Sequence, residues 1–248
     1  MKYKYNLIAL TGPVISEGMT GATFDKTIRR TQRKIVRFDC REYVRYYIDW
    51  TKTKTDNYKL IYLSWDNDFS LISKNFGSEI EIINVGTPES NFRAKWQFEP
   101  FVHENFINYL EQNFFDNVLR IRSDIKLDMN NVDKSLMFMG DTSNKVIVPY
   151  IASDGKMQDF YFGGSPNFLV KFCKNINNGY RDIHGPHYDA LICQTLLRHL
   201  PWAHKIKLSY LKYLSHYVGA QIQVPMDKTI YENLEWRGEK FTTLYGHM

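Results

Sequence analysis

The sequence lacks the features by which several large classes of protein are recognised. Its 248 residues include only three cysteines, Cys40, Cys173 and Cys193, and no two of them form a C-x-x-C pair. Widely spaced cysteines in odd number argue against a disulfide framework or a zinc ribbon, and they suit the reduced thiols of a cytosolic protein. No apolar run approaches the ~18 residues that a transmembrane helix needs, and the first is too short for a signal peptide. We therefore expect a cytosolic protein.

The sequence also lacks a large excess of charge of either sign. The formal net charge is +5, and the excess is spread along the chain apart from one basic run at residues 29–34. This modest excess suits nucleotide phosphates, a phosphorylated acceptor or peripheral contact with an anionic membrane surface. It is lower than a dedicated nucleic-acid-binding protein requires, and the sequence contains no motif of that class. We expect an anionic partner other than nucleic acid.

Aromatic side chains, by contrast, are abundant. The chain has 17 Tyr, 16 Phe and 5 Trp, which together make up 15% of the sequence. Many should belong to the core, but aromatic rings also give a large contact area at low entropic cost and line many ligand clefts. One interpretation is therefore a non-catalytic carbohydrate-binding or scaffold protein whose aromatic cleft holds a glycan without turnover.

The first third of the chain alternates between buried-strand and helical patterns. The strand patterns are residues 5–9, 59–65 and 79–85. The helical patterns are 23 to about 47, after a Gly-containing loop at 16–21, and about 68–76. A β-α-β-α-β series with short connections predicts a parallel sheet in a doubly wound α/β fold.

Ligands of such sheets bind outside the carboxyl ends of the strands. Three segments should therefore meet in one crevice: Thr11-Gly12-Pro13, Ser64-Trp65-Asp66 and Asn84-Val85-Gly86. Trp65 suits stacking on a base or ribose, with a place in the core as the alternative. A helix N-terminus and Arg29 would add contacts to phosphate, although the loop matches neither a Walker A nor a G-x-G-x-x-G motif.

A strand pattern at about 117–121 ends on Arg122-Ser123-Asp124, a cation, a hydroxyl and a carboxylate in a row. Charges at the end of a strand, rather than on its solvent face, indicate a site in a cleft. The alternative is an ordinary edge strand with solvated charges. The flanking patterns are a helix at 91–113, a strand at 146–151, an aromatic strand at 159–164, a helix beginning at Pro166 and a helix at 188–200.

In this order, the segments resemble the WavE-type lipopolysaccharide glycosyltransferases. The matching pieces, from about residue 7 to 200, are Gly12-Pro13-Val14, Thr27-Ile28-Arg29, Leu63-Ser64-Trp65, Ile121 to Ile125, Asp159 to Gly163 and Tyr188-Asp189. The resemblance implies a single GT-A-like α/β domain with a Rossmann-type, mostly parallel central sheet and a smaller C-terminal, acceptor-side subregion. Residues 1–128 would be the nucleotide-sugar-binding half and residues 129–248 the acceptor-side half.

The resemblance also implies a Mn or Mg ion at the donor diphosphate, since the leaving group's developing charge must be neutralised. Asp124 stands in the position of the second Asp of a DxD motif and is the expected metal ligand. Arg122 takes the position of the first Asp, which leaves it and Ser123 to contact phosphate or a sugar hydroxyl. His247 could reach back as a further ligand, as C-terminal histidines do in some GT-A enzymes.

An inverting glycosyltransferase needs a general base that accepts the proton of the acceptor hydroxyl. Asp189, at the start of the 188–200 helix, is the first candidate, and Asp159 is the second. The resemblance leads us to expect Glu-Gln where this chain has Asp189-Ala190. A charge that complements the helix dipole would also explain Asp189.

The leading hypothesis is a glycosyltransferase that moves a sugar from a nucleotide-sugar donor to a glycan or lipopolysaccharide acceptor. We expect it in the cytoplasm or peripherally bound at the inner face of the membrane. The alternatives are a nucleotidyltransferase-like, nucleotide-binding enzyme on a similar sheet and the non-catalytic carbohydrate-binding protein described above.

Overall fold

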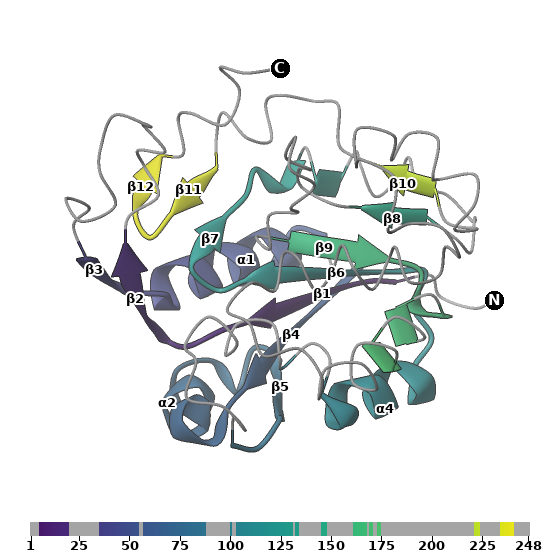
Figure 1. Ribbon diagram of the computed structural model, residues 1–248, viewed down its shortest axis with the longest axis horizontal. Coiled ribbons are helices and arrows are strands. Elements are labelled where there is room, and N and C mark those ends of the chain that lie inside the picture. The colour runs from purple at the N-terminus through teal and green to yellow at the C-terminus, as the bar shows by residue number, and fades with distance from the viewer. Residues whose placement is uncertain are drawn as a thin grey trace, which may run out of the picture.

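The fold was analysed in a computed structural model. The described residues are 5–19, 35–54, 57–87, 100, 103–130, 132–133, 145–147, 161–167, 169–170, 173–174, 221–223 and 234–240. Their centre is a seven-stranded sheet with strand order β10-β8-β9-β6-β1-β4-β5 (Figure 1). The strands of this sheet are β1 (Asn6–Thr11), β4 (Tyr58–Ser64), β5 (Glu81–Asn84), β6 (Asn117–Arg122), β8 (Lys145–Ile147), β9 (Tyr161–Gly164) and β10 (Gln221–Gln223).

Neighbouring strands from β6 through β1 and β4 to β5 are all parallel, and β9 runs antiparallel to both β6 and β8. The expected α/β fold with a mostly parallel central sheet is therefore confirmed. The division into halves at residue 128 stays a prediction. β6 pairs with β1 on one side and β9 on the other, so the edge-strand interpretation of this segment is wrong.

Both faces of the central strands are covered, as their unbroken apolar runs require. Ile8 and Leu10 belong to a core cluster with residues of helices α1 (Arg41–Lys52) and α2 (Asp66–Phe76). Leu7 and Ala9 alternate with them on β1 and are equally buried, at 0% exposure. Helix α4 (Glu104–Gln112), which precedes β6, buries one apolar stripe of its own. None of the described helices is both long and apolar enough to cross a membrane.

The structure corrects the expected loop at 16–21 and the expected helix at 23–47. Residues Ile15–Met19 form β2, and Ile35–Asp39 form β3, which pairs with β2 in an antiparallel ribbon. Helix α1 begins only at Arg41. The alternation of exposed Ile35 and Arg37 with half-buried Val36 and Phe38 is the period of a strand, and pairing with β2 stabilises it. Residues 20–34 lie outside the described residues.

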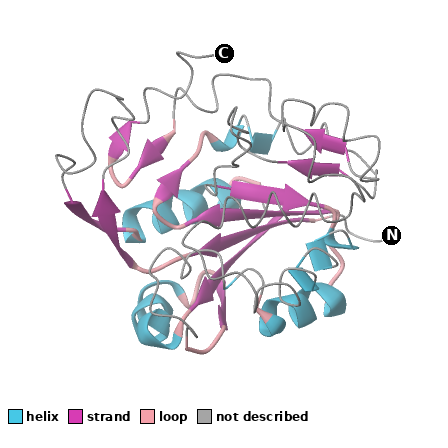
Figure 2. Cartoon of the chain, viewed as in Figure 1, coloured by secondary structure: helices cyan, strands magenta, loops and turns pink. Residues whose placement is uncertain are grey.

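A small three-stranded sheet adds a C-terminal hairpin to the segment after β6. Its order is β12 (Glu239–Lys240), β11 (Glu235–Trp236) and β7 (Ile125–Lys126). Figures 1 and 2 show this hairpin beside the β2–β3 ribbon. The expected helix at 91–113 is wrong at His103, which is extended and precedes α4. The other expectations differ mainly at their ends: α2 begins at Asp66, β9 spans Tyr161–Gly164, and helix residues begin at Pro166. The expected helix at 188–200 falls outside the described part of the chain.

Candidate functional site

The carboxyl ends of β1, β4 and β5 lie at one edge of the sheet and are joined by hydrogen bonds. The backbone N–H of Val85 donates to Ser64 O over 2.9 Å, and that of Asp66 donates to Gly86 O over 2.9 Å. The N–H of Val14 donates to Oδ2 of Asp68, over 3.0 Å. The structure thus brings together the three segments that were expected to meet.

The end of β6 is connected to the same edge through the loop after β1. The N–H of Ser123 donates to Thr11 O over 2.8 Å, and the Ser123 hydroxyl donates to Pro13 O over 3.1 Å. The Tyr62 hydroxyl donates to Gly12 O over 2.8 Å. Gly12 has a φ of 131°, a conformation that glycine adopts readily and other residues rarely. Hydrogen bonds from Tyr62 on β4 and from Ser123 after β6 therefore hold the backbone of this loop.

Of the two residues after β4, Trp65 is buried and Asp66 is exposed. Trp65 is only 4% exposed, and its ring meets that of His103 edge-on at 6.5 Å, which favours the core interpretation. Asp66 is exposed and accepts hydrogen bonds from Asn84 (2.8 Å) and Thr87 (2.7 Å). Those hydrogen bonds lower the pKa of Asp66. An ionised carboxylate therefore faces solvent at this edge.

Asp68 is a residue that sequence reasoning left out of the site. It lies in the first turn of α2, half-buried, with the Val14 N–H on its carboxylate. Burial raises the pKa of Asp68, and the hydrogen bond from Val14 opposes that rise. Its position two residues after Asp66 was the available signal.

The cluster after β6 is the most densely charged part of the described site. Asp124 is 0% exposed, and Arg122 approaches it with two nitrogens, Nε to Oδ1 and Nη2 to Oδ2, each at 2.9 Å. Oδ2 also accepts from Ser16 Oγ (2.9 Å) and Trp236 Nε1 (3.2 Å), and Nε of Arg237 lies 3.1 Å away. Burial alone would raise the pKa of Asp124, but Arg122, Arg237 and Ser16 hold it well below the usual value. Asp124 is therefore ionised.

This donor set does not fit a metal ion at Asp124. Five nitrogen and hydroxyl groups already approach Asp124, four of them at Oδ2 and one at Oδ1, and three of the five belong to arginine side chains. Mg²⁺ and similar ions need an oxygen ligand at about 2.0–2.1 Å and are repelled by adjacent guanidinium groups. The described residues also contain no group of three or more His, Cys, Asp or Glu side chains placed to hold a metal. The metal-ligand role of Asp124 stays a prediction, and this geometry opposes it.

The C-terminal hairpin brings in two residues that sequence reasoning missed, Trp236 and Arg237. Gly238 after Arg237, between two short polar-apolar segments, is a recognisable hairpin signal. It cannot show what the hairpin packs against, because Trp236 is 112 residues from Asp124 in the sequence. Four other expected site residues lie outside the described residues, and their roles stay predictions: Arg29, Asp159, Asp189 and His247.

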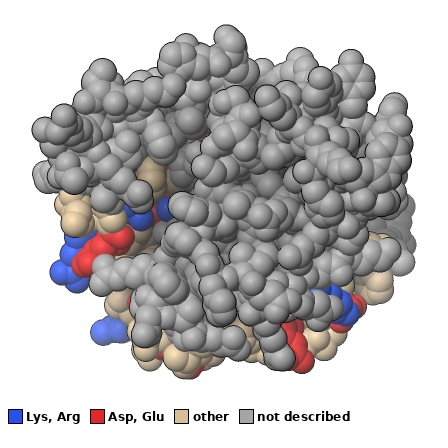
Figure 3. Space-filling view, in the orientation of Figure 1, with Lys and Arg blue, Asp and Glu red and all other residues tan. Residues whose placement is uncertain are grey.

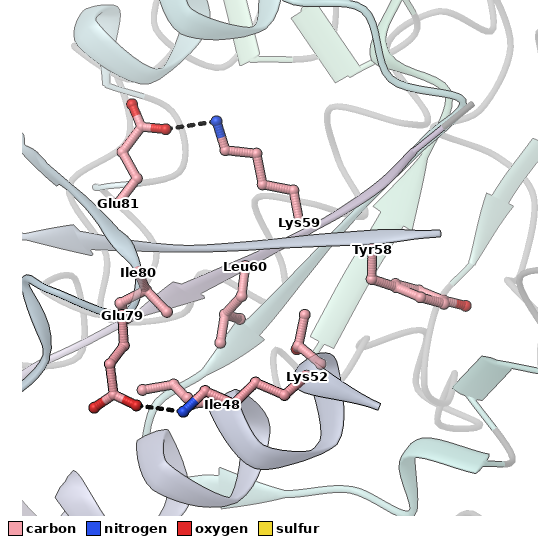
Figure 4. A pocket seen from close by; sticks show the side chains of 9 residues that line it. Ile48, Lys52, Tyr58, Lys59, Leu60, Glu79, Ile80 and Glu81 are labelled. Atoms are coloured by element: carbon pink, nitrogen blue, oxygen red, sulfur yellow. Dashed lines mark hydrogen bonds and ion pairs between the residues drawn. The ribbon is translucent and has the colours of Figure 1, made fainter. Parts of the chain in front are cut away.

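A shallow cavity of about 270 Å³ lies at the opposite edge of the sheet, where β4 and β5 begin (Figure 4). Its apolar floor includes Ile48 and Leu60, and its charged side chains face one another as Lys–Glu pairs. On the face drawn in Figure 3, charges of both signs are likewise side by side among the residues shown in colour. Paired surface charges of this kind do not by themselves indicate a ligand.

The fold and this edge define an α/β protein with a candidate ligand site at the carboxyl ends of its parallel strands. No protein-family model and no curated protein matches the chain. Among solved structures, it is similar to a glycosyltransferase involved in glycosylation of the major capsid of PBCV-1, with 9% identity, a TM-score of 0.44 and coverage of 89% of this chain and 81% of that one.

Two further solved structures are similar to this chain at the same low identity. The 4-diphosphocytidyl-2C-methyl-D-erythritol synthase of Anaerococcus prevotii has 9% identity and a TM-score of 0.42, over 78% of this chain and 84% of that one. A putative glucose-1-phosphate thymidylyltransferase from Bacillus anthracis has 9% identity and a TM-score of 0.40, over 95% and 90%. Likenesses this distant assign no activity.

Proposed function

We propose that this protein is a glycosyltransferase that moves a sugar from a nucleotide-sugar donor to a glycan or lipopolysaccharide acceptor. The observation that supports this most is the convergence at one sheet edge of the segments after β1, β4, β5 and β6. Open α/β sheets bind ligands at that edge. The segments offer backbone groups, an exposed carboxylate and two buried guanidinium groups, which suits a ribose and a diphosphate.

In the proposed reaction, an acceptor hydroxyl attacks the anomeric carbon of the donor, and the nucleoside diphosphate leaves with the bonding electrons. The hydroxyl proton goes to a general base, for which Asp189 is the first candidate and Asp159 the second. The Mn or Mg dependence that the resemblance implies stays a prediction. We assign no step to a metal, because the carboxylate expected to bind it is surrounded by arginine, serine and tryptophan donors. The location, cytoplasmic or peripheral at the inner face of the membrane, stays a prediction as well.

The proposal is tested by calorimetric titration with UDP-, GDP- and CMP-sugars, each with and without Mn, followed by assays of hydrolysis and transfer. We expect one nucleotide class to bind and its sugar to be released or transferred. If no nucleotide-sugar bound under any condition, the proposal would be wrong. Binding without turnover would favour the carbohydrate-binding protein, and release of pyrophosphate from a nucleoside triphosphate would favour the nucleotidyltransferase.

The general base has a separate test. Asp189→Asn should lower the rate of transfer by roughly 10²–10⁴-fold while donor affinity is kept, since a base acts only as the proton moves. An unchanged transfer rate would move the role to Asp159 or indicate a retaining mechanism.

A further inference from the structure

We propose that Arg122, Asp124 and Arg237 form an anion site that binds the donor diphosphate through guanidinium charge, with no divalent cation on Asp124. The proposal rests on the proposed function in one respect only, that the anion belongs to a nucleotide-sugar. It assigns Asp124 as the counter-ion that positions two arginines, and it brings the hairpin residue Arg237 into the donor site.

The charges of the cluster favour an anion. Two guanidinium groups and one carboxylate sum to +1, and all three side chains are at most 8% exposed. Guanidinium groups bind phosphate oxygens through paired hydrogen bonds, and they do so more strongly where water is excluded. Nearby carboxylates have contacts of their own: Glu17 lies 3.5 Å from Arg37, Glu235 pairs with Lys126 at 3.2 Å, and Asp68 accepts from Val14.

Arg237 has a backbone conformation that is unfavourable for its residue type. Arg237 and Gly238 connect β11 to β12 as a two-residue turn, with φ angles of 50° and 79°. Such turns strongly prefer Asn, Asp or Gly at the first position, because positive φ is strained for other residues. The N–H of Arg237 donates to Asp124 O over 2.9 Å, so backbone and side chain both contact Asp124. A strained residue fixed in this way points to a functional constraint.

The guanidinium group of Arg237 packs directly against Gly18. A Cβ atom added to Gly18 of β2 would lie only 2.4 Å from Arg237 Nη1 and 2.8 Å from Cζ. The indole ring of Trp236 lies 5.4 Å from Arg122 Cζ and 5.1 Å from Arg237 Cζ, within the range of cation–π attraction. One aromatic ring thus contacts both cations, and the absence of a side chain at Gly18 admits the second.

The cluster also borders the loop assigned to the donor. Asp124 directly follows Ser123, whose N–H and hydroxyl donate to the backbone of Thr11 and Pro13. Ser16, two residues after Val14, donates to Asp124 and accepts from Nε of Arg237 over 2.9 Å. The charges and the donor loop are therefore parts of one hydrogen-bonded unit.

The test uses inorganic pyrophosphate as the probe, titrated calorimetrically into the full chain in EDTA. We expect binding that weakens with rising salt. Arg237→Asn should reduce affinity about ten-fold or more, the effect of losing one charge-assisted hydrogen bond, while Asn suits the turn. Arg37→Asn, which removes an equal charge from an exposed side chain (73%) on β3, is the matched control and should change affinity less than about two-fold.

A second variant keeps every charge and moves only the guanidinium group. Gly18→Ala should weaken pyrophosphate binding in EDTA, because the new methyl group overlaps Arg237 Nη1. When Mn²⁺ is titrated alone, the unaltered protein and Asp124→Asn should bind it equally. The inference would be overturned if pyrophosphate or a nucleotide-sugar bound only with Mn, or if Arg237→Asn bound as well as the control variant.

Failure of the inference can be told apart from failure of the proposed function. A nucleotide-sugar that binds and turns over only with Mn would keep the function and reject the arginine site. Pyrophosphate binding in EDTA that depends on Arg237, without binding of any nucleotide-sugar, would keep the anion site and reject the function.

Discussion

The two edges of the central sheet differ in how deeply their charged side chains are buried. At the amino ends of β4 and β5, Lys52 pairs with Glu79 and Lys59 with Glu81, each at 2.6 Å, around an open cavity. Glu79 also pairs with Arg45 at 2.7 Å, and all of these side chains are partly exposed. At the carboxyl edge, two arginine side chains that are 7% and 8% exposed share the fully buried carboxylate of Asp124.

The difference shows that the more visible hollow is not the better candidate site. Solvent screens the ion pairs at the amino edge, so the cavity in Figure 4 has little reason to attract an ion. Buried charges are costly unless they are compensated. The concentration of buried charge at the carboxyl edge therefore suggests function, and variants at the two edges should behave differently.

The largest difference should come from Asp124→Asn. The change leaves Arg122 and Arg237 buried without their counter-ion, which should lower the free energy of unfolding by about 3–5 kcal/mol, measured by urea denaturation. Asp39→Asn is the control, since it breaks an ion pair with Arg41 that is partly exposed, and it should cost much less. A metal-ligand role for Asp124 would give the reverse: intact stability and loss of metal-dependent donor binding.

Acid should act on the same carboxylate. The pKa of Asp124 is lower in the folded protein than its usual value of 3.8. Its contribution to stability is therefore complete above the unfolded pKa and is lost as pH falls through the folded pKa. Asp124→Asn should flatten the fall in stability below about pH 4. A fall as steep as in the unaltered protein would show that other carboxylates determine it.

Gly18→Ala should have the next largest effect. A methyl group 2.4 Å from Arg237 Nη1 forces the guanidinium group away and should cost about 1–3 kcal/mol, as overpacked sites do. The double variant with Arg237→Asn is the control. Because the overlap is with the Arg237 side chain, the added cost of Gly18→Ala should largely vanish in that background. An additive result would mean that the strain lies in the β2 backbone instead.

A pair of tyrosines allows the two edges to be compared directly. The Tyr62 hydroxyl donates to Gly12 O at the carboxyl edge, whereas the Tyr58 hydroxyl donates to Asp133 Oδ1 at the amino edge. Tyr62→Phe should cost about 0.5–1.5 kcal/mol, the usual net value of a hydrogen bond, and Tyr58→Phe about 1.5–3 kcal/mol, because its acceptor is a carboxylate. Only Tyr62→Phe should also weaken donor or pyrophosphate binding, by loosening the Gly12 loop. Equal effects of both changes on binding would remove the distinction between the edges.

Lys59→Gln should have the smallest effect. It breaks the partly exposed pair with Glu81 and should change stability by about 0.2–1 kcal/mol, and less at high salt. Pyrophosphate affinity should be unaltered. A marked loss of affinity would instead make the cavity at the amino edge a binding site.

The sequence predicted the central strands because their signal is local. β1 and β4 are mainly apolar runs of strand length bounded by polar residues, the pattern of strands buried on both faces. The β-α-β order then placed their carboxyl ends at one edge. The β2–β3 ribbon was not predicted because its signal is not local. Its short, half-exposed strands have little apolar periodicity, and their pairing joins segments on either side of residues 20–34.

The sequence predicted that strand ends would meet in a crevice, and it did not predict the contacts that their side chains make. The sequence alone determined that Arg122, Ser123 and Asp124 end a strand, whereas the pairing of β6 with β1 in the structure places them beside the loop after Thr11. Only the tertiary structure decided what Asp124 does there, because its partners Ser16, Trp236 and Arg237 come from distant segments. A carboxylate binds whichever donors the fold brings within hydrogen-bonding distance, and a linear pattern does not contain that distance.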